Sequence, residues 1–333
     1  MSVKSEYAIL GLGNPFCDRI AHVDDPFLQK HHLARGQSTF TNDRSAVEVT
    51  WKDATQNIQS VFQWALGGSG TNVIKTLAYL GNKCAIQGKI GSDEIGKNIE
   101  ARLKEIGVTS WLSKELSSSG IVNCFVTPDA QRTMHASLGI SEKSCESDCV
   151  LNLPKYDHIH IEGYAAYFED TLENSIAFAK KRGASISLDL ASCNVVEQFK
   201  SKFEGCLSEA DYLFSNVEEM QILKGHNSVS EAMMDFDSHQ TIVVTNGSNG
   251  CWVKNRGESE AIHYNAREVR NVKDTTGAGD FFAAGFIHGS LRHKDVSECV
   301  MMGNLAASFV IQEEGADLPE EKWCALRNLI WKI

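Results

Sequence analysis

Short apolar runs alternate with amphipathic helical patterns along almost the whole chain of 333 residues. The strands that this alternation predicts cover residues 7–13, 84–90, 158–161, 185–190, 212–214 and 241–245. Helical patterns follow several of these runs, with apolar residues three and four positions apart and a glycine such as Gly81 or Gly107 at the end. Repetition of strand and helix is typical of a parallel sheet covered by helices, so the sequence predicts an α/β fold.

Two stretches interrupt the alternation, residues 16–50 and 110–140. Neither contains the pattern of a long helix, and the second has strand-like runs on both sides of Pro128 and Asp129. Since the stretches flank the first strand–helix units, we expect them to form a small β lid over the carboxyl edge of the main sheet. The ranges expected for the large domain are 1–15, 51–109 and 141–333.

Charge and cysteine usage exclude several classes of protein. The chain has 32 Lys and Arg against 43 Asp and Glu, a net charge of −11, and no basic stripe, so we expect no nucleic-acid partner. A small phosphorylated ligand remains compatible with this charge because backbone N–H groups can bind a phosphate locally. The apolar run at residues 8–12 is too short for a signal-peptide core or a membrane span, so we expect a cytoplasmic protein with reduced cysteines and no membrane partner. The nearest Cys and His residues match no usual zinc spacing.

The strongest motif is Asp-Thr-Thr-Gly-Ala-Gly-Asp at residues 274–280, directly before an apolar helix. The small residues Gly277, Ala278 and Gly279 allow their N–H groups to converge on an anion, and the helix dipole adds positive potential there. Asp280 follows in the first turn, where a carboxylate can accept the proton of a hydroxyl during phosphoryl transfer, even with an ordinary Asp pKa. The alternative is a capped helix after a flexible loop, in which Asp280 only serves the dipole.

Two further motifs offer groups for binding hydroxyls. Residues 67–72, Gly-Gly-Ser-Gly-Thr-Asn, end a strand and open a helix, and Asn72 can both donate and accept hydrogen bonds. At the end of the first strand, Pro15 holds Asn14 extended and the carboxylate of Asp18 can bind paired hydroxyls. A plain strand-to-helix turn is the alternative for the first motif.

Residues 91–97 imitate a phosphate-binding loop of the GxxxxGK type. Asn98 stands where magnesium needs a Ser or Thr hydroxyl, and Asp93 and Glu94 would lie against the phosphates. We therefore reject this segment as a phosphate site.

Taken together, these motifs resemble the two signatures of the ribokinase-like (PfkB) family of sugar and nucleoside kinases. Residues 67–72 with 88–96 are similar to the N-terminal signature, and residues 274–286 are similar to the C-terminal one, about 200 residues later. The resemblance runs from about Leu10 to about Gly315. Within the family, the segments 11–18 and 129–134 look most like adenosine kinase and its bacterial relatives.

The resemblance implies a three-layer α/β/α sandwich with a mostly parallel sheet and a small β-sheet lid. It also implies ATP as phosphoryl donor, Mg²⁺, and transfer to a primary hydroxymethyl group of a nucleoside or sugar. Asp280 corresponds to the family's base, with the N–H groups of Gly277, Ala278 and Gly279 stabilising charge on the transferring phosphate. The positions that correspond to the acceptor site are Asn14, Asp18, Gly68 and Asn72.

The same resemblance assigns residues to the nucleotide and to metal ions. Asn216 and Glu219 fit an NxxE element that organises magnesium through water, although Asn216 is also a good helix N-cap. Asp274 and Thr276, with carbonyls near residues 315–316, correspond to a potassium site found in many members, although Asp274 also suits a turn cap. The positions implied for the nucleotide are Thr245, Gly247, Gly250 and Asn304.

Two points about the acceptor stay open in the sequence. Arg132 lies on an expected lid strand, where it either reaches the phosphates on closure or is solvated. Four aromatic residues could stack on a nucleoside base, or could pack in the core as such residues commonly do. These four are Phe16, Phe40, Phe125 and Phe168.

The expected partner is therefore a small sugar or nucleoside, and the expected assembly is a monomer or homodimer. One competing hypothesis is a regulatory relative that binds ligand without turnover, which the intact Asp280, Asn216 and Glu219 oppose. The other is a nucleotide-dependent oxidoreductase, which the missing GxGxxG fingerprint opposes.

Overall fold

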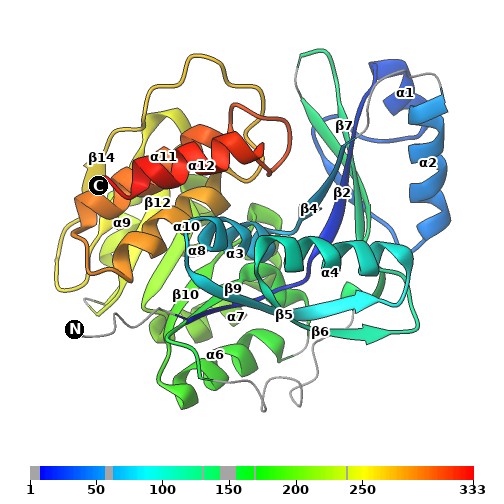
Figure 1. Cartoon of the computed structure of the whole chain (residues 1–333). Helices are drawn as coiled ribbons and strands as arrows, with labels where there is room; N and C mark the ends of the chain where they lie inside the picture. The colour runs from blue at the N-terminus through cyan, green and yellow to red at the C-terminus, as the bar shows by residue number, and fades with distance from the viewer. Residues whose placement is uncertain (1–7, 57–62, 130, 143–154, 169, 238) are drawn as a thin grey trace.

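The computed structural model describes residues 8–56, 63–129, 131–142, 155–168, 170–237 and 239–333. Its largest feature is a nine-stranded sheet that runs through the middle of the molecule (Figure 1). From edge to edge the order is β14 (Ile262–Tyr264), β13 (Cys251–Lys254), β12 (Thr241–Thr245), β11 (Tyr212–Asn216), β10 (Ser185–Asp189), β9 (His158–Glu162), β1 (Ala8–Leu12), β5 (Lys83–Gly91) and β6 (Thr109–Glu115). The pairs from β12 to β6 are parallel, whereas β13 and β14 pair antiparallel.

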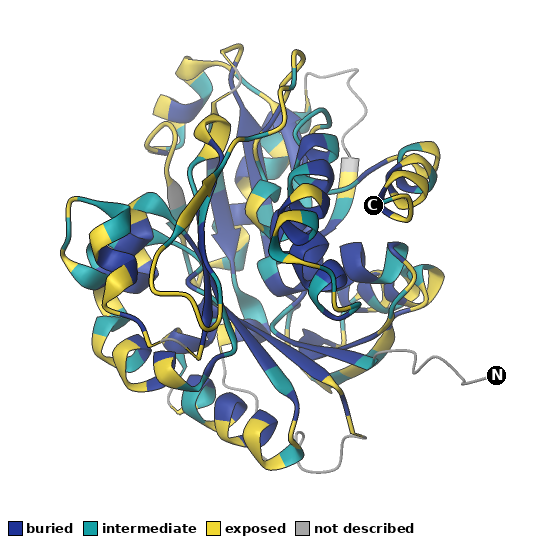
Figure 2. Cartoon of the chain, turned by 90° about the vertical axis from the view of Figure 1, so that its left-hand side faces the viewer, coloured by how far each residue is buried: buried dark blue, intermediate teal, exposed yellow. Residues whose placement is uncertain are grey.

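Helices cover both faces of this sheet because successive side chains of a strand point to opposite faces. Ile9 belongs to the core under α3 (Ser69–Tyr79), α4 (Glu94–Ile106), α10 (Ala278–Ser290) and α11 (Val296–Val310). Leu10 belongs to the core under α6 (Thr171–Arg182), α7 (Cys193–Cys206), α8 (Val217–Lys224) and α9 (Val229–Met234). The last helix, α12 (Glu320–Ile330), packs on α10 and α11 through Trp323. Figure 2 shows the buried strands between half-exposed helices, which confirms the three-layer prediction.

A second sheet of five strands stands beside the large one, with α1 (Asp25–Lys30) and α2 (Arg44–Gln56) along one side (Figure 1). Its order is β3 (Ser38–Phe40), β8 (Arg132–Ser137), β7 (Ile121–Val126), β2 (Phe16–His22) and β4 (Gln63–Gly67). A small core of its own includes Ala21, Leu28 and Phe125. The predicted small sheet is therefore confirmed.

Two details of the small sheet differ from the sequence prediction. The expectation that residues 16–50 contain no long helix is wrong, because α2 begins at Arg44 and has 13 residues. Asp43 starts this helix by accepting hydrogen bonds from the N–H groups of Ser45 and Ala46. In addition, β4 belongs to the small sheet although its residues were expected in the large domain. The strand β6 belongs to the large sheet although most of its residues were expected in the lid. An isolated strand carries no mark of the sheet that it joins, since its partners come from distant parts of the chain.

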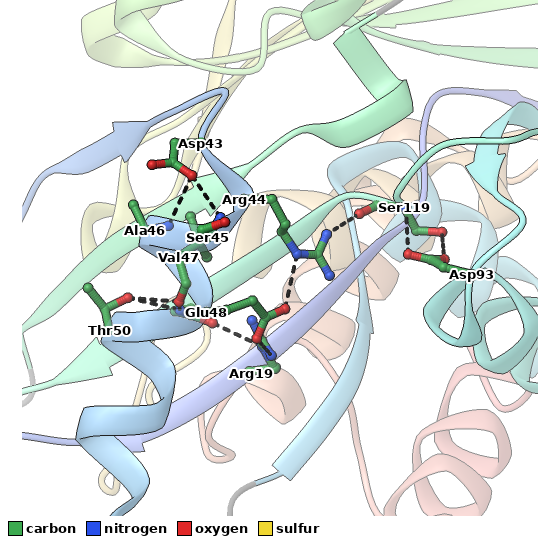
Figure 3. A network of polar contacts seen from close by, with 11 residues as sticks. Arg19, Asp43, Arg44, Ser45, Ala46, Val47, Glu48, Thr50, Asp93 and Ser119 are labelled. Carbon is green, nitrogen blue, oxygen red and sulfur yellow. Dashed lines mark hydrogen bonds and ion pairs between the residues drawn. The ribbon is translucent and has the colours of Figure 1, made fainter.

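A network of polar contacts ties the small sheet to the large one (Figure 3). Arg19 on β2 and Arg44 on α2 both donate to the carboxylate of Glu48, at 2.9 and 3.0 Å. Arg44 also donates to the carbonyl of Ser119 at 2.7 Å, and the Ser119 hydroxyl donates to Asp93 at 2.6 Å. Because Asp93 is the N-cap of α4, the segment that imitated a phosphate loop is a capped helix start.

Two further observations concern the cysteines and the helices. The eight described cysteines are all free thiols, whereas Cys145 and Cys149 lie outside the described residues. None of the helices in the described part of the chain is long and apolar enough to cross a bilayer. The cytoplasmic location stays a prediction.

Candidate active site

Asp280 lies in the first turn of α10, next to the first turn of α3. Ser69 Oγ donates to Asp280 Oδ1 at 2.7 Å, and Asn72 Nδ2 donates to Oδ2 at 2.9 Å. The two motifs of the sequence therefore meet, because both helices start at the carboxyl edge of the large sheet. Asn72 Oδ1 is buried and has no hydrogen-bond partner among the described residues, so it can accept a hydrogen bond from a ligand hydroxyl.

The electrostatic setting of Asp280 shifts its pKa, although the predicted chemistry does not require a shifted pKa. Desolvation raises the pKa of Asp280, while the hydrogen bonds from Asn72 and Ser69 and the nearby Lys75 ammonium lower it; the net direction is upward. A carboxylate with a raised pKa is a better proton acceptor near neutral pH. The direction of this shift therefore suits the general-base role that the sequence predicts for Asp280.

The loop before α10 has the backbone form expected of an anion site, with one difference. Gly277 has φ +74°, and an added Cβ would lie 2.8 Å from the Cβ of Ala316, so glycine is required there. The N–H of Ala278 donates to the carbonyl of Thr275 at 3.2 Å and closes the turn instead of facing an anion. The hydrogen bond removes Ala278 from the three predicted N–H donors, and an anion site at Gly277 and Gly279 stays a prediction.

Asp18 faces the same site from β2 of the small sheet. Its carboxylate lies against Gly67 of the paired strand β4, where an added Cβ would be 2.1 Å from the oxygen Oδ2. Burial raises the pKa of Asp18 to about 6, although Lys75 and Arg132 act in the opposite direction. The two sheets thus bring together the carboxylates of Asp18 and Asp280.

A cavity of about 480 Å³ opens between the two sheets above these carboxylates. The predicted residues that line it are Asn14, Asp18, Gly68, Asn72, Arg132, Thr276 and Asp280. Its aromatic lining consists of Phe16, Phe40, Tyr164, Tyr167 and Phe168. Phe125 is fully buried and packs on Phe27, with ring centroids 5.0 Å apart, so its expected role in stacking is wrong and the core alternative is confirmed.

Glu162 is a buried carboxylate that also lines the cavity and is absent from the site predicted from the sequence. Its Oε1 accepts from the N–H of Asn14 at 3.1 Å and its Oε2 from the N–H of Gly70 at 2.8 Å. Burial raises the pKa of Glu162 to about 7 despite these hydrogen bonds. One signal was present in the sequence: Glu162 directly follows an apolar strand, and ligands of α/β sheets bind at the carboxyl ends of strands.

Asn216 and Glu219 form a capping box at the start of α8. Asn216 Oδ1 accepts from the N–H of Glu219 at 2.8 Å, and the N–H of Asn216 donates to Glu219 Oε2 at 3.0 Å. The N-cap alternative is therefore confirmed. Burial raises the pKa of Glu219. At the end of β10, burial and the negative charges of Glu219 and Asp280 raise the pKa of Asp189.

These desolvated acids suit a nearby divalent cation, which would favour their charged forms. Among the described residues, however, no three acidic, His or Cys side chains are close enough to hold a metal directly. The donor set therefore fits a magnesium ion held mainly by phosphates and water, as the sequence predicts for Asn216 and Glu219.

The residues predicted to bind the nucleotide lie outside the cavity of Asp280. Thr245 ends β12 and is in register with Asn216 on β11. Gly247 and Gly250, with φ of +52° and +90°, form the connection between the antiparallel strands β12 and β13. Asn304 lies on α11, which packs on α10, and its Nδ2 donates to a backbone carbonyl. Their nucleotide role stays a prediction.

The residues predicted to bind potassium already form hydrogen bonds and an ion pair with other groups of the protein. Arg132 Nη1 donates to Thr276 Oγ1 at 2.7 Å, and Arg132 Nη2 forms an ion pair with Asp274. Asp274 Oδ1 accepts from the N–H of Thr276 at 3.0 Å, and Oδ2 accepts from the N–H of Gly315 at 2.7 Å. This set does not fit a potassium ion in addition, because the guanidinium lies at the carboxylate that would bind it.

Comparison with known proteins is consistent with this geometry. The pfkB family of carbohydrate kinases matches residues 38–323. An uncharacterized sugar kinase from Archaeoglobus fulgidus is 30% identical over 245 residues, which cover 72% of this chain and 96% of the relative. Adenosine kinase 1 from Arabidopsis thaliana is 25% identical over 351 residues, covering 94% of this chain and 96% of the relative. The crystal structure of adenosine kinase from Sinorhizobium meliloti superposes with a TM-score of 0.84 at 26% identity, covering 98% of this chain and 100% of that one.

Proposed function

Because the chain belongs to the pfkB family of carbohydrate kinases, which are phosphotransferases with an alcohol group as acceptor, we propose that it transfers the γ-phosphoryl group of ATP to the hydroxymethyl group of a nucleoside. One observation carries the choice of acceptor: carboxylate and amide groups line the cavity together with five aromatic rings. Asp18, Asn72 and Asp280 offer partners for ribose hydroxyls, whereas the rings of Phe16 and Phe168 suit the faces of a base.

A free sugar is the second candidate, supported by relatives named sugar kinase and ribokinase. A sugar alone would leave much of a 480 Å³ cavity unfilled and the aromatic rings that line it exposed to water. The size and lining of the cavity therefore favour the nucleoside. A regulatory relative without turnover is disfavoured because Asp280 retains both of its hydrogen-bond donors.

In the proposed reaction, the carboxylate of Asp280 accepts the proton of the hydroxymethyl group as its oxygen attacks the γ-phosphorus. The bond between that phosphorus and the bridging oxygen breaks, and ADP leaves. The N–H groups of Gly277 and Gly279, with the dipole of α10, stabilise the charge on the transferring group. Ser69 and Asn72 keep the carboxylate oriented toward the hydroxyl, so little reorganisation is needed during the reaction.

Magnesium bound with ATP would supply positive charge that offsets the phosphate oxygens. We assign Glu219 and Asn216 to the water shell of this ion, with Asp189 beside them on the next strand. The capping box orients the Glu219 carboxylate at the carboxyl edge of the sheet without any ligand, so the chain itself preorganises this corner.

ATP turnover against a panel of acceptors tests the proposal. The panel contains adenosine, other nucleosides, ribose, fructose and fructose phosphates, and release of ADP is the readout. We expect kcat/KM for a nucleoside to exceed that for ribose by at least about a hundredfold, since the base would add buried aromatic contacts worth about 3 kcal/mol. Equal kcat/KM values for ribose and nucleosides would favour the sugar as acceptor. If ADP is released with no acceptor of the panel, the protein is not a kinase of this acceptor class.

A further inference from the structure

Arg132 connects the small sheet with the loop before α10 at the edge of the cavity. It is the first residue of β8 in the small sheet, and its side chain is 12% exposed. The guanidinium reaches the loop before α10, where it donates to Thr276 Oγ1 and pairs with the carboxylate of Asp274. A planar guanidinium that contacts a hydroxyl and a carboxylate at the same time fixes the position and the angle of both groups relative to each other.

Asp274 is the centre of the loop that Arg132 contacts. Its two oxygens accept hydrogen bonds from the N–H groups of Thr276 and Gly315, so this one carboxylate joins two chain segments 41 residues apart. Asp274 is only 8% exposed, and a buried carboxylate needs a counter-charge. The guanidinium of Arg132 supplies that positive charge. Asp274 lies three residues before Gly277, where the anion-binding turn begins.

A second cation of the chain holds the adjoining segment. Lys75 is fully buried, and its Nζ donates to the carbonyls of Leu66 and Ala316 at 2.9 and 2.5 Å. The carbonyl of Ala316 directly follows Gly315, whose N–H binds Asp274. Lys75 thus contacts the carbonyl of Ala316, and Arg132 contacts the carboxylate of Asp274. The family resemblance assigns both of these oxygen groups to a potassium site.

The small sheet contacts the same segment at another point. His22 at the end of β2 lies 3.2 Å from the carboxylate of Glu314, and a Cβ added to Gly315 would lie 2.9 Å from the terminal methyl group of Ile20. Strand β2 therefore touches the segment whose N–H group binds Asp274, and Arg132 of β8 contacts Asp274 itself. The arrangement of Asp274 depends on the position of the small sheet.

We propose that the guanidinium of Arg132 takes the place of a monovalent cation at Asp274, so that the small sheet, in the position described, completes the anion site at Gly277 and potassium is not required. Arg132 is then a positioning residue that acts through Asp274 and Thr276. Because residues of β2 and β8 line the cavity together with Asp280, an acceptor bound there would stabilise this position of the small sheet and so couple its own binding to the geometry of phosphate binding. The inference rests on the proposed kinase function for its kinetic consequence only.

Cation replacement tests the inference by turnover. Wild-type rates in potassium chloride and in tetramethylammonium chloride of equal ionic strength should agree within about twofold. Arg132→Ala should lower kcat at least tenfold in tetramethylammonium, and added potassium or guanidinium ion should restore at least part of the loss. Arg132→Lys should lie between the two, because an ammonium cannot contact Thr276 and Asp274 as a fork.

Thermal unfolding without substrates gives a readout that does not depend on turnover. Potassium or guanidinium ion at millimolar concentration should raise the unfolding midpoint of Arg132→Ala and leave wild type unchanged. Arg35→Ala is the matched control, because Arg35 is another lid arginine but pairs with the exposed Asp25 and Asp129. It should show no response to either ion.

Two outcomes would overturn the inference: activation of the wild type severalfold by potassium, or an Arg132→Ala protein that responds to neither ion in either assay. If no acceptor is phosphorylated, the proposed function fails, while the unfolding experiment still decides whether Arg132 fills a cation site.

Discussion

The hydroxyl of Ser69 donates a 2.7 Å hydrogen bond to Oδ1 of Asp280, a residue 211 positions further along the chain. With Asn72 on the other oxygen, the carboxylate is fixed at both ends by the first turn of a neighbouring helix. A base held in this way needs little reorganisation when it accepts a proton. This contact makes the first turns of α3 and α10 a single functional unit.

Replacing the base should separate chemistry from binding. We expect Asp280→Asn to lose at least about a hundredfold in kcat, because proton acceptance and alignment of the hydroxyl are lost together. The dissociation constant of ATP should stay within about threefold of the wild-type value. Steady-state kinetics and equilibrium binding measure the two quantities.

Ser69→Ala is the matched milder variant, since it removes one charged hydrogen bond and leaves the base in place. It should lower kcat by about tenfold, in line with roughly 1.5 kcal/mol for such a bond. Near-normal turnover of Asp280→Asn would remove Asp280 from the chemistry.

Asp18 should make acceptor binding depend on pH. Burial raises the pKa of Asp18 to about 6, so the carboxylate becomes protonated as pH falls through 6 and then accepts fewer hydrogen bonds from acceptor hydroxyls. We expect KM for the acceptor to rise below pH 6 while KM for ATP stays constant. Measurements of both constants between pH 5 and pH 8 check this.

The variant Asp18→Asn should raise KM for the acceptor about tenfold and remove the pH dependence near 6. Glu162→Gln is the companion variant, because the pKa of Glu162 is raised to about 7 and its protonation would produce a separate step. An unchanged step near pH 6 in Asp18→Asn would assign the titration to another group.

Glu219 should set the requirement for magnesium. Glu219→Gln keeps the shape of the capping box but removes a buried negative charge, so we expect half-maximal turnover to need at least about fivefold more Mg²⁺. Chelation with EDTA should abolish turnover of both proteins. Glu218→Gln is the control, because Glu218 is its exposed neighbour. If the two variants respond equally to Mg²⁺, the effect is one of general surface charge.

Two buried histidines should make the fold sensitive to acid. His158 and His160 on β9 contact the hydroxyls of Ser185 and Ser187 inside the large sheet. Burial lowers the pKa of each histidine from 6.5 to about 3, so between these values the unfolded chain binds more protons than the native one. Stability is therefore complete above pH 6.5 and is lost as pH falls, by on the order of 1 kcal/mol per pH unit for each histidine.

Urea unfolding at pH 7, 6 and 5 measures this slope. His160→Gln should show a shallower slope than wild type, and His239→Gln, which changes an exposed histidine, should show the wild-type slope. Equal slopes in all three proteins would mean that other groups cause the acid sensitivity.

The local pattern of the sequence determined the large sheet and the chemical centre. Alternating strands and helices are local signals, and a glycine such as Gly107 ends its helix in the left-handed conformation that the pattern predicts. The motif around Asp280 is also local, since a helix start, its small residues and its first-turn carboxylate lie within seven residues. These features could be predicted because their cause lies within a few turns of chain.

Only the tertiary structure decided which side chains meet at that centre. Glu162 reaches the cavity because β9 lies beside β1, and β4 completes the small sheet by pairing with β2. The contact between Arg132 and Asp274 joins residues 142 positions apart, one at the start of a strand of the small sheet and the other in the loop before α10. Pairing over such distances depends on how the layers pack, and no local period of the sequence records it, so the counter-charge at Asp274 became visible only in the folded molecule.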